Sequence, residues 1–531
     1  MFDIVIRNGL IVSGSGEKPY PGSVFIKDGR IAGISRETAP ICEAKEIIDA
    51  EGKVIAPGFI DIHTHSDLSY LASPEMRTSL SAGVTLEVGG NCGGSAIPVK
   101  DPDADPDMLG QPALFAGRVK RKNFASTDVT SYAESILRNG SSINMGILIG
   151  HGTLRSYVMG WEKRQLTAKE TDEMCALLAE MFREGALGVS LGLIYSPGSF
   201  CDTAEIDALA KVAAEYDRVL TVHMRNENAR VFEALEEMIG VGKRSGCKIE
   251  ISHLKLMGKN QWGRAEELLR KIDDARESGV LIGADQYPYT ASHSGITSAI
   301  PLWAMDGGGG KLLERVKDDE TWRKMVPAVL ALLESRGGAE NVTVSDFHGA
   351  GDESWLGKTL TEIADERGES LPETVRHLIL ATGGALSCFW KCMSEEDVLG
   401  ILAKRDIAVV TDGTTYDPRA YGGRPHPRNT GSFPRALWLI RENHLMPLEA
   451  AVRKCTSLPA SVMGIDDRYG YLKEGYMASV TVFDPVRITD RADYLDPTRP
   501  SEGIETVIVN GEKVFEKGVF FAARPGRLVI K

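Results

Sequence analysis

The segment VIAPGFIDIHTHSD, residues 54–67, indicates the architecture of this chain more clearly than any other. An apolar run ends at Asp61 and continues directly into His63 and His65. Side chains two residues apart on a strand point to the same face, so these two imidazoles would lie together. An H-x-H pair is a weak signal alone, but after a buried strand it indicates a metal site at the carboxyl end of that strand.

Short apolar runs alternate with amphipathic stretches from about Pro57 to Asp466. Residues 204–217 and 265–279, for example, carry apolar side chains at helical spacing. Strands that alternate with helices imply a parallel sheet, and about eight such units imply a (β/α)8 TIM barrel. The candidate strands end near His65, Cys92, His151, Tyr195, His223, His253, Tyr287 and Asp412.

The two chain ends differ from this middle part in sequence pattern. Their short apolar runs, separated by Asn-Gly and Asp-Gly pairs, predict short strands joined by turns. The interval between Tyr287 and Asp412 is also too long for one βα unit, which predicts an insertion. We therefore expect an α/β protein with three parts. They are a composite small β-sandwich of residues 1–57 and 467–531, a barrel of residues 58–466, and an inserted subdomain at about 294–345.

The composition limits the classes of partner. A formal net charge of −13 argues against nucleic acid and anionic membranes, because both need a basic surface. No apolar run approaches the roughly 20 residues that cross a bilayer, and the start MFDIVIRNGL does not resemble a signal peptide. The eight cysteines are scattered without a C-x-x-C pair, so we expect a reducing cytoplasmic location. The oligomeric state stays open.

Five of the ten histidines stand at the ends of strand-like runs, and this bias predicts a metal site. They are His63, His65, His151, His223 and His253. The carboxyl ends of barrel strands converge on one mouth, where such side chains would meet. Cys92 of GGNCGG also follows a candidate strand, and imidazole with thiolate is a ligand set that Zn²⁺ favours. Without this context, Cys92 would be interpreted as a small buried hydrophobe.

Asp412 of IAVVTDG ends the last candidate strand and is the candidate for acid–base chemistry. A carboxylate beside metal-activated water can take its proton and pass it to a leaving amine. An Asp-Gly pair alone would more simply predict a turn. The histidines favour the catalytic interpretation.

These segments resemble the D-aminoacylase, or N-acyl-D-amino-acid deacylase, family of the amidohydrolase superfamily. The resemblance covers nearly the whole chain, through VIAPGFIDIHTHSD, GVTLEVGGNCGGS, GHGTLR, GALGVSLGLIYSPG, HMRNE, SHLK, VVTDG, HPRNTGSFPR and GYLKEGYMASVTVFDP. GNCG and HPRNTGSFPR are the specific motifs, because they separate this family from hydantoinases and dihydroorotases. The resemblance implies a zinc-dependent enzyme that hydrolyses the amide bond of N-acyl-D-amino acids.

The resemblance also implies a role for each candidate residue. The principal Zn²⁺ would be held by Cys92, His223 and His253, and a weaker second site would be formed by His63 and His65. Asp412 would be the general base and acid. The substrate carboxylate would be contacted by Tyr195, Lys255 and Arg428. In the mechanism that we hypothesise for such a site, Tyr195 or His151 would donate a hydrogen bond to the oxyanion. An arginine fork suits the single carboxylate of such a substrate.

Three departures from the family pattern concern the site. Leu254 stands where the family usually has a second histidine after the ligand, so the surroundings of His253 would differ. TASHSGI, residues 290–296, is unusual in a region that shapes the substrate side-chain pocket of the family. No lysine lies near the fourth candidate strand, so the carboxylated-lysine bridge of binuclear relatives cannot form there. This favours one functional metal, with Cys92 in the bridging place.

Three other interpretations remain. GVSLG, residues 188–192, matches the nucleophile elbow of serine hydrolases, although Pro197 and Gly198 follow where that motif needs a helix. A barrel can also be a non-catalytic scaffold. The same site could instead act on a cyclic amide or another N-acyl compound. Preference for the D form rests on the resemblance alone, and the substrate side chain and acyl group stay open.

Overall fold

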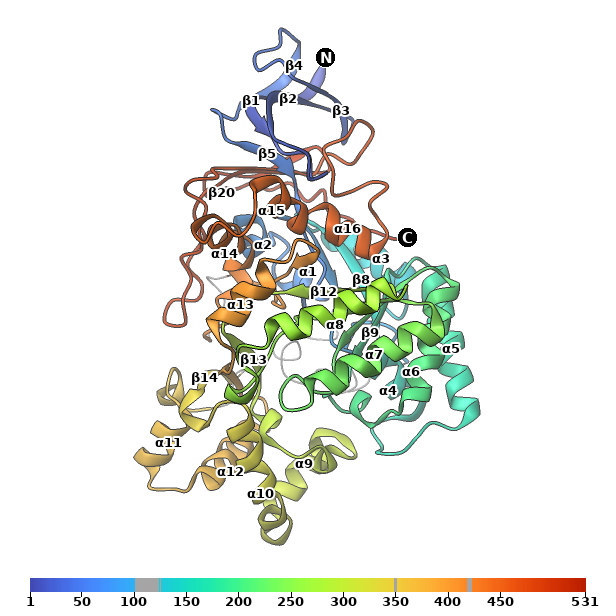
Figure 1. Ribbon diagram of the computed structural model, residues 1–531, viewed down its shortest axis with the longest axis vertical. Coiled ribbons are helices and arrows are strands. Elements are labelled where there is room, and N and C mark those ends of the chain that lie inside the picture. The colour runs from blue at the N-terminus through green and yellow to red at the C-terminus, as the bar shows by residue number, and fades with distance from the viewer. Residues whose placement is uncertain (101–123, 125, 348–350, 418–422) are drawn as a thin grey trace.

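The computed structural model describes residues 1–100, 124, 126–347, 351–417 and 423–531. An α/β barrel occupies the middle of the molecule, as Figure 1 shows. A β-sheet built mainly from the N-terminal strands lies at the upper end of that view, and a subdomain with helices α9–α12 lies at the lower end.

The barrel contains eight parallel strands in the order β16-β12-β11-β10-β9-β8-β7-β6. They are β6 (Phe59–Asp61), β7 (Val84–Gly89), β8 (Asn144–Gly150), β9 (Gly188–Gly192), β10 (Val219–His223), β11 (Lys248–Ile251), β12 (Ile282–Gln286) and β16 (Ile407–Val409). Nearly all their residues are buried, as expected when helices cover one face of a parallel sheet and side chains fill the other.

The barrel closes between its first and last strands just beyond their carboxyl ends. Thr64 and Gly413 form a parallel bridge. The amide of Asp412 donates to the carbonyl of His63, and the amide of His65 donates to the carbonyl of Gly413. The predicted eight-stranded barrel is therefore confirmed, and its closing contacts lie at the predicted site.

Helices alternate with these strands. They are α1 (Ser69–Ala72), α2 (Arg77–Ser81), α3 (Val129–Asn139), α4 (His151–Met159), α5 (Ala168–Arg183), α6 (Thr203–Glu215), α7 (Val231–Ser245), α8 (Ala265–Glu277), α13 (Glu395–Leu402), α14 (Arg428–Glu442), α15 (Leu448–Cys455) and α16 (Ser457–Met463). The predicted helices at 204–217 and 265–279 are confirmed as α6 and α8. The Asp202 side chain caps α6, and a left-handed Gly279 follows α8.

Strands from both chain ends form one continuous nine-stranded sheet. They are β1 (Phe2–Ile11), β2 (Tyr20–Lys27), β3 (Arg30–Ser35), β4 (Ala44–Asp49), β5 (Val54–Pro57), β17 (Val480–Phe483), β18 (Ile504–Val509), β19 (Glu512–Glu516) and β20 (Val519–Phe520). β5 joins the two ends, because it pairs with β1 on one side and with β17 on the other. The expected β unit from both ends is present as one sheet, although its bounds stay a prediction.

The segment between β12 and β16 has a sheet and a hydrophobic core of its own. Its elements are β13 (Ala291–Gly295), α9 (Gly308–Lys317), α10 (Asp319–Ser335), β14 (Val342–Asp346), α11 (Leu360–Arg367), α12 (Leu371–Thr382) and β15 (Ser387–Lys391). It extends well beyond the predicted range of about 294–345, because β15 is the central strand between β13 and β14. The subdomain needs that late strand to complete its sheet.

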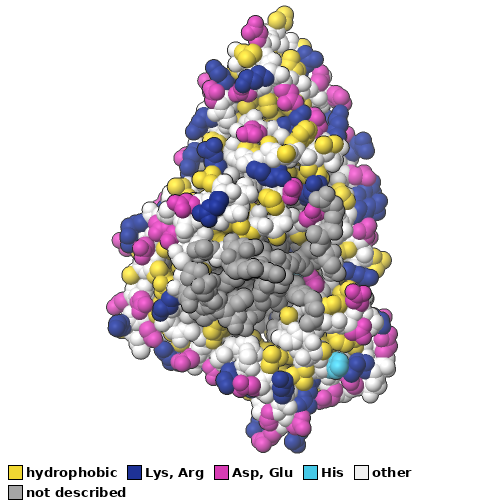
Figure 2. All heavy atoms as spheres, turned by 180° about the vertical axis from the view of Figure 1, so that it is seen from behind, with side chains coloured by type: hydrophobic (Ala, Val, Ile, Leu, Met, Phe, Trp, Pro, Cys, Tyr) yellow, Lys and Arg dark blue, Asp and Glu magenta, His cyan; other side chains and the backbone are white. Residues whose placement is uncertain are grey.

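No helix among the described residues is both long enough and apolar enough to span a membrane. Acidic and basic side chains are interspersed over the described part of the face in Figure 2.

Candidate metal centre

Side chains from several strand ends meet at the barrel mouth. His223 is the last residue of β10, whereas Cys92, His253 and Asp412 lie a few residues past β7, β11 and β16. The backbones of these three residues are left-handed, with φ values of 51°, 39° and 50°. Non-glycine residues rarely adopt this conformation, which costs on the order of 1 kcal/mol and occurs preferentially at functional sites. The mouth therefore contains three residues in a conformation that their side chains disfavour.

One cluster joins Cys92, His223 and His253, all buried. The Sγ atom of Cys92 lies 3.7 Å from Nδ1 of His223 and 3.4 Å from Nε2 of His253. A tetrahedral zinc ion, with Zn–S about 2.3 Å and Zn–N about 2.0–2.1 Å, would separate sulfur and nitrogen by about 3.5 Å. The spacing and the chemistry of this donor set therefore fit Zn²⁺ and leave a fourth position for water or substrate.

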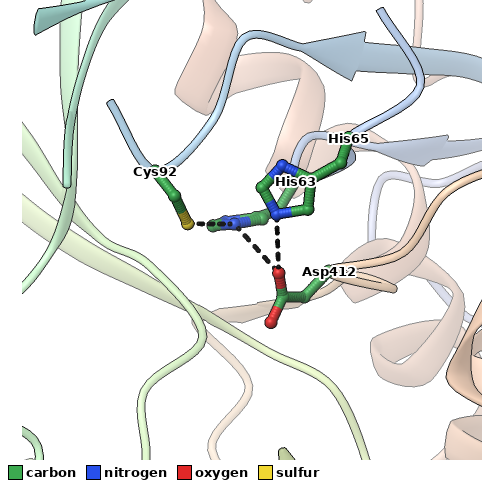
Figure 3. Close-up of side chains that lie close together, drawn as sticks. All are labelled: His63, His65, Cys92 and Asp412. Atoms are coloured by element: carbon green, nitrogen blue, oxygen red, sulfur yellow. Dashed lines mark hydrogen bonds and ion pairs between the residues drawn. The ribbon is translucent and has the colours of Figure 1, made fainter. Parts of the chain in front are cut away.

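A second cluster joins His63, His65, Cys92 and Asp412, and Figure 3 shows these four side chains converging. Nε2 of His63 lies 3.3 Å from the Cys92 sulfur and 3.5 Å from Oδ1 of Asp412. The same Oδ1 lies 3.1 Å from Nε2 of His65. Cys92 belongs to both clusters. The bridging place that the sequence predicts for it stays a prediction.

Glu227 faces both imidazoles of the first cluster from the side opposite Cys92. Its Oε2 lies 3.3 Å from Nε2 of His223, an ion-pair contact without an aligned hydrogen bond. Its Oε1 lies 3.1 Å from Nδ1 of His253 and 2.5 Å from Nζ of Lys255. Sequence reasoning missed this residue, although Glu227 is the last letter of the HMRNE motif. The signal was its i+4 spacing from His223.

Asp285 and Asp61 support the metal cluster from inside the barrel, and sequence reasoning assigned neither a role. Asp285, on β12, accepts the amide of His253 at 2.5 Å and lies 3.5 Å from Nδ1 of His63. Asp61 accepts the amide of His63 at 3.2 Å and the hydroxyl of Thr411 at 2.6 Å. Asp61 therefore connects the two sides of the barrel seam directly below the site.

The electrostatics of the site are dominated by buried acidic groups. Burial raises the pKa of the Cys92 thiol well above its ordinary value, and Asp412 raises it further, with Lys255 opposing. Burial also raises the pKa of Asp412, but Arg428 and His253 outweigh it, so the net pKa lies well below its ordinary value. A bound cation would favour the thiolate, because coordination deprotonates a thiol.

Two cations and two tyrosines lie beside the clusters. Nη1 of Arg428 lies 2.7 Å from Oδ2 of Asp412, whereas its Nε is buried without a hydrogen-bond partner among the described residues. Arg428 also stacks 4.7 Å from the Tyr287 ring, and the buried Tyr287 hydroxyl likewise has no partner there. The Tyr195 ring packs edge-on against His223 at 5.0 Å. Tyr195, Lys255 and Arg428 are thus brought to the metal cluster, and Tyr287 joins them.

His151 lies apart from this group. It begins α4, in the outer helical layer, and its Nε2 lies 2.7 Å from Glu205 of α6. Arg155 contacts the same carboxylate. In this position His151 contacts Glu205 and joins neither of the two clusters described above, because it is the first residue of α4 and its ring faces α6.

Ser190 of the GVSLG segment is fully buried within β9. Its hydroxyl donates to the carbonyl of Gly90 and accepts the amide of Gly93 at 3.1 Å. The next α-helix, α6, starts only at Thr203. Ser190 therefore lacks the exposed strand–helix turn of a nucleophile elbow and instead supports the loop that carries Cys92.

Comparison with known proteins shows the family of the chain. The chain matches the amidohydrolase family over residues 46–273 and 410–515. The chain therefore contains the metal-dependent hydrolase barrel of the amidohydrolase family. The gap in the match contains the inserted subdomain.

Full-length relatives narrow the class. The chain is 36% identical to an N-acyl-D-glutamate deacylase of Alcaligenes xylosoxydans xylosoxydans, covering 99% of this chain and 96% of the relative. It is 32% identical to a D-aminoacylase of the same organism, covering 100% and 98%. The chain belongs to the D-aminoacylase, or N-acyl-D-amino-acid deacylase, family of amidohydrolases.

A solved structure is similar over the full length of both chains. It is the N-acyl-D-glutamate deacylase from Bordetella bronchiseptica, complexed with zinc and a phosphonate inhibitor that mimics the tetrahedral intermediate. The TM-score is 0.82 at 33% identity, with 100% of each chain covered.

Proposed function

We propose that this protein is a zinc-dependent hydrolase that cleaves the amide bond of N-acyl-D-amino acids into a carboxylate and a free D-amino acid. The observation that carries the proposal is the buried Cys92–His223–His253 cluster beside Asp412 and Arg428. It is supported by similarity to deacylases along the whole chain. An open-chain substrate is favoured over a cyclic amide, because Nε of Arg428 has no partner among the described residues and can donate to a free carboxylate.

Cys92, His223 and His253 would hold the principal zinc ion, and His63 and His65 with Asp412 would form a weaker second site. A bound zinc ion polarises a carbonyl and makes water a better nucleophile at neutral pH. The left-handed backbone conformations of Cys92 and His253 would orient the side chains of these two ligands toward the zinc site. Glu227 holds the outer nitrogens of both imidazoles, as carboxylates behind zinc ligands do.

Asp412 would act as general base and then as general acid. Its Oδ1 accepts a proton from the attacking water and later returns that proton to the leaving nitrogen, so that the amine departs uncharged. Arg428 keeps Asp412 ionised and ready to accept a proton at the start of each cycle, because it stabilises the carboxylate through Oδ2.

The substrate would be oriented by groups that remain available at the mouth. Arg428 binds the α-carboxylate through its free edge, and Lys255 adds a second positive charge. Tyr195 and Tyr287 can donate hydroxyl hydrogens to the carboxylate or to the developing oxyanion. With the carboxylate, the scissile carbonyl and the side chain each assigned a place, one enantiomer fits better than the other.

The decisive experiment compares zinc-loaded protein on paired N-acetyl-D- and N-acetyl-L-amino acids, covering glutamate, aspartate, methionine, leucine and phenylalanine. Amine release confined to D substrates, and abolished by a chelator and restored by Zn²⁺, is the expected result. Release from L substrates alone, or none from any pair with zinc bound, would contradict the proposal.

We also propose a reducing compartment, the cytoplasm, as the place of action. All eight cysteines lie in the described part of the chain and none forms a disulfide. Thiols that stay unpaired are typical of reducing compartments. Localisation of a tagged chain in its native cell would test this.

A further inference from the structure

Arg336, at the carboxyl end of α10, has a guanidinium group without a partner. Among the described residues it makes no hydrogen bond or ion pair, and its Nε is fully buried. Within the described part of the chain, the guanidinium contacts the Trp390 ring, whose centroid lies 5.1 Å from the guanidinium carbon. A basic residue at a helix carboxyl end is favourable by itself. The buried Nε of Arg336, without a hydrogen-bond partner among the described residues, is costly because this donor has lost water.

The turn that carries Arg336 packs on the barrel mouth, although α10 belongs to the inserted subdomain (Figure 1). Nδ2 of Asn228, in the loop after β10, donates to the Ser335 hydroxyl at 3.3 Å. The carbonyl of Ser335 packs closely against Gly258, in the segment after β11. The turn that carries Arg336 therefore lies against the two loops that also carry Glu227 and Lys255.

The positive charge of Arg336 acts on Tyr195 at the barrel mouth. Burial raises the pKa of the Tyr195 hydroxyl well above its ordinary value, and Cys92, Asp412 and Glu227 raise it further. Arg336 acts on that pKa in the opposite direction. A cation that influences Tyr195 across the mouth would also influence an anionic ligand there.

The other cations of the mouth have protein partners. Lys255 lies 2.5 Å from Glu227, and Arg428 lies 2.7 Å from Asp412. A substrate with one carboxylate would use the free edge of Arg428 and still leave Arg336 unpaired. A substrate with a second carboxylate on its side chain would pair both arginines.

We propose that Arg336 is a specificity-determining residue that binds the side-chain carboxylate of an acidic N-acyl-D-amino acid. This inference rests on the proposed deacylase function and names its substrate class. The substrate is therefore a dicarboxylate. Arg428 binds its α-carboxylate, and Arg336, from a different part of the chain, binds its side-chain carboxylate.

The test compares kcat/KM for N-acetyl-D-glutamate and N-acetyl-D-aspartate with that for N-acetyl-D-leucine and N-acetyl-D-methionine. We expect wild type to prefer the acidic substrates. Arg336→Met should lower kcat/KM for them about 10- to 100-fold, through KM, and leave the neutral substrates within about 3-fold. Arg336→Lys should fall between, because a point charge replaces the fork. Arg323→Met is the matched control, since Arg323 is exposed on the same helix.

Several outcomes would overturn the inference and leave the deacylase function intact. They are a wild-type preference for neutral substrates, an equal loss on both classes in Arg336→Met, or no loss on either. Zinc content and melting temperature of each variant separate a binding effect from unfolding. Absence of turnover on every N-acyl-D-amino acid would overturn the proposed function itself, and this inference with it.

Discussion

Asp412 and Arg428 form an ion pair at the barrel mouth, with Oδ2 and Nη1 2.7 Å apart. The residue proposed as the base and the residue proposed to grip the substrate carboxylate therefore share one electrostatic unit. Oδ1 of Asp412 faces His63 and His65, whereas Oδ2 faces Arg428. One carboxylate thus contacts the metal cluster and the substrate side of the site at the same time.

Asp412→Asn should remove catalysis and keep the metal. The amide retains the shape of the side chain but cannot accept the proton, so kcat should fall about 10²- to 10⁴-fold. Zinc bound at Cys92, His223 and His253 should remain near one per chain. Turnover and zinc content measured on the same preparation check this. An Asn variant that keeps wild-type turnover would rule out Asp412 as the base.

Cys92→Ala should remove the principal zinc. The variant loses the one sulfur donor that both clusters share. Two imidazoles alone hold Zn²⁺ far more weakly than three ligands. Metal analysis after dialysis should find much less than one zinc per chain. Cys388→Ala is the control, because Cys388 is equally buried but lies in β15 of the inserted subdomain. Equal zinc contents in the two variants would contradict the ligand assignment.

Glu227→Gln should weaken zinc binding without removing a ligand. Loss of a carboxylate behind metal-bound imidazoles typically costs 10- to 100-fold in affinity. Competition with a chromogenic chelator gives the dissociation constant directly. The absorption spectrum of the cobalt-substituted protein should also change, since the geometry of both imidazoles relaxes. Glu237→Gln, which disturbs a partly exposed pair with Arg225 and a hydrogen bond from Thr203, should change neither measurement.

Ser190→Ala distinguishes the metal mechanism from a serine nucleophile. A serine hydrolase would lose activity by several orders of magnitude. Here the hydroxyl only supports Gly90 and Gly93 in the Cys92 loop. At saturating zinc, kcat should stay within about tenfold of wild type, with a lowered melting temperature because buried backbone groups lose a partner. An inactive variant that still binds zinc would favour the serine mechanism.

Lys454 should make folding stability depend on pH. Its Nζ is buried and donates to the carbonyls of Leu402 and Lys404. Burial lowers its pKa from 10.5 to about 7. Between these values the unfolded chain binds more protons than the folded chain, so this group makes stability rise with pH across that window. In Lys454→Met the rise should be smaller. Urea unfolding at pH 7 and pH 9 measures the free energy of unfolding of both proteins. An equal change in that free energy between the two pH values would contradict the lowered pKa of Lys454.

Apolar runs that end in polar residues made the barrel predictable from sequence. A parallel strand buried on both faces reads as a continuous apolar run, and the chemistry begins where the run ends. For this reason the sequence alone identified His223, His253 and Asp412 as candidate site residues at the ends of strands. The inserted subdomain was less predictable, because β15 pairs with β13 about a hundred residues earlier in the chain. A local pattern carries no signal of such a distant pairing.

The direction of a side chain was harder to predict than its place in the chain. His151 follows a strand like the other histidines, but it begins a helix, and its ring is turned to Glu205. Glu227 and Asp285 were missed because the sequence does not predict the directions of the histidine side chains that they contact. Their importance depends on which nitrogen of each imidazole faces outward, and spacing along the chain does not encode this.

The barrel seam determines when the site can exist during synthesis. Cys92, His223 and His253 emerge from the ribosome in the first half of the chain, whereas Asp412 and Arg428 emerge 159 and 175 residues after His253. The hydrogen bonds that join residues 63–65 to residues 412–413 close the barrel only after that point. A nascent or truncated chain that ends before them carries the three thiol and imidazole ligands without the base and without the closed barrel, so a shortened polypeptide is expected to turn over no substrate.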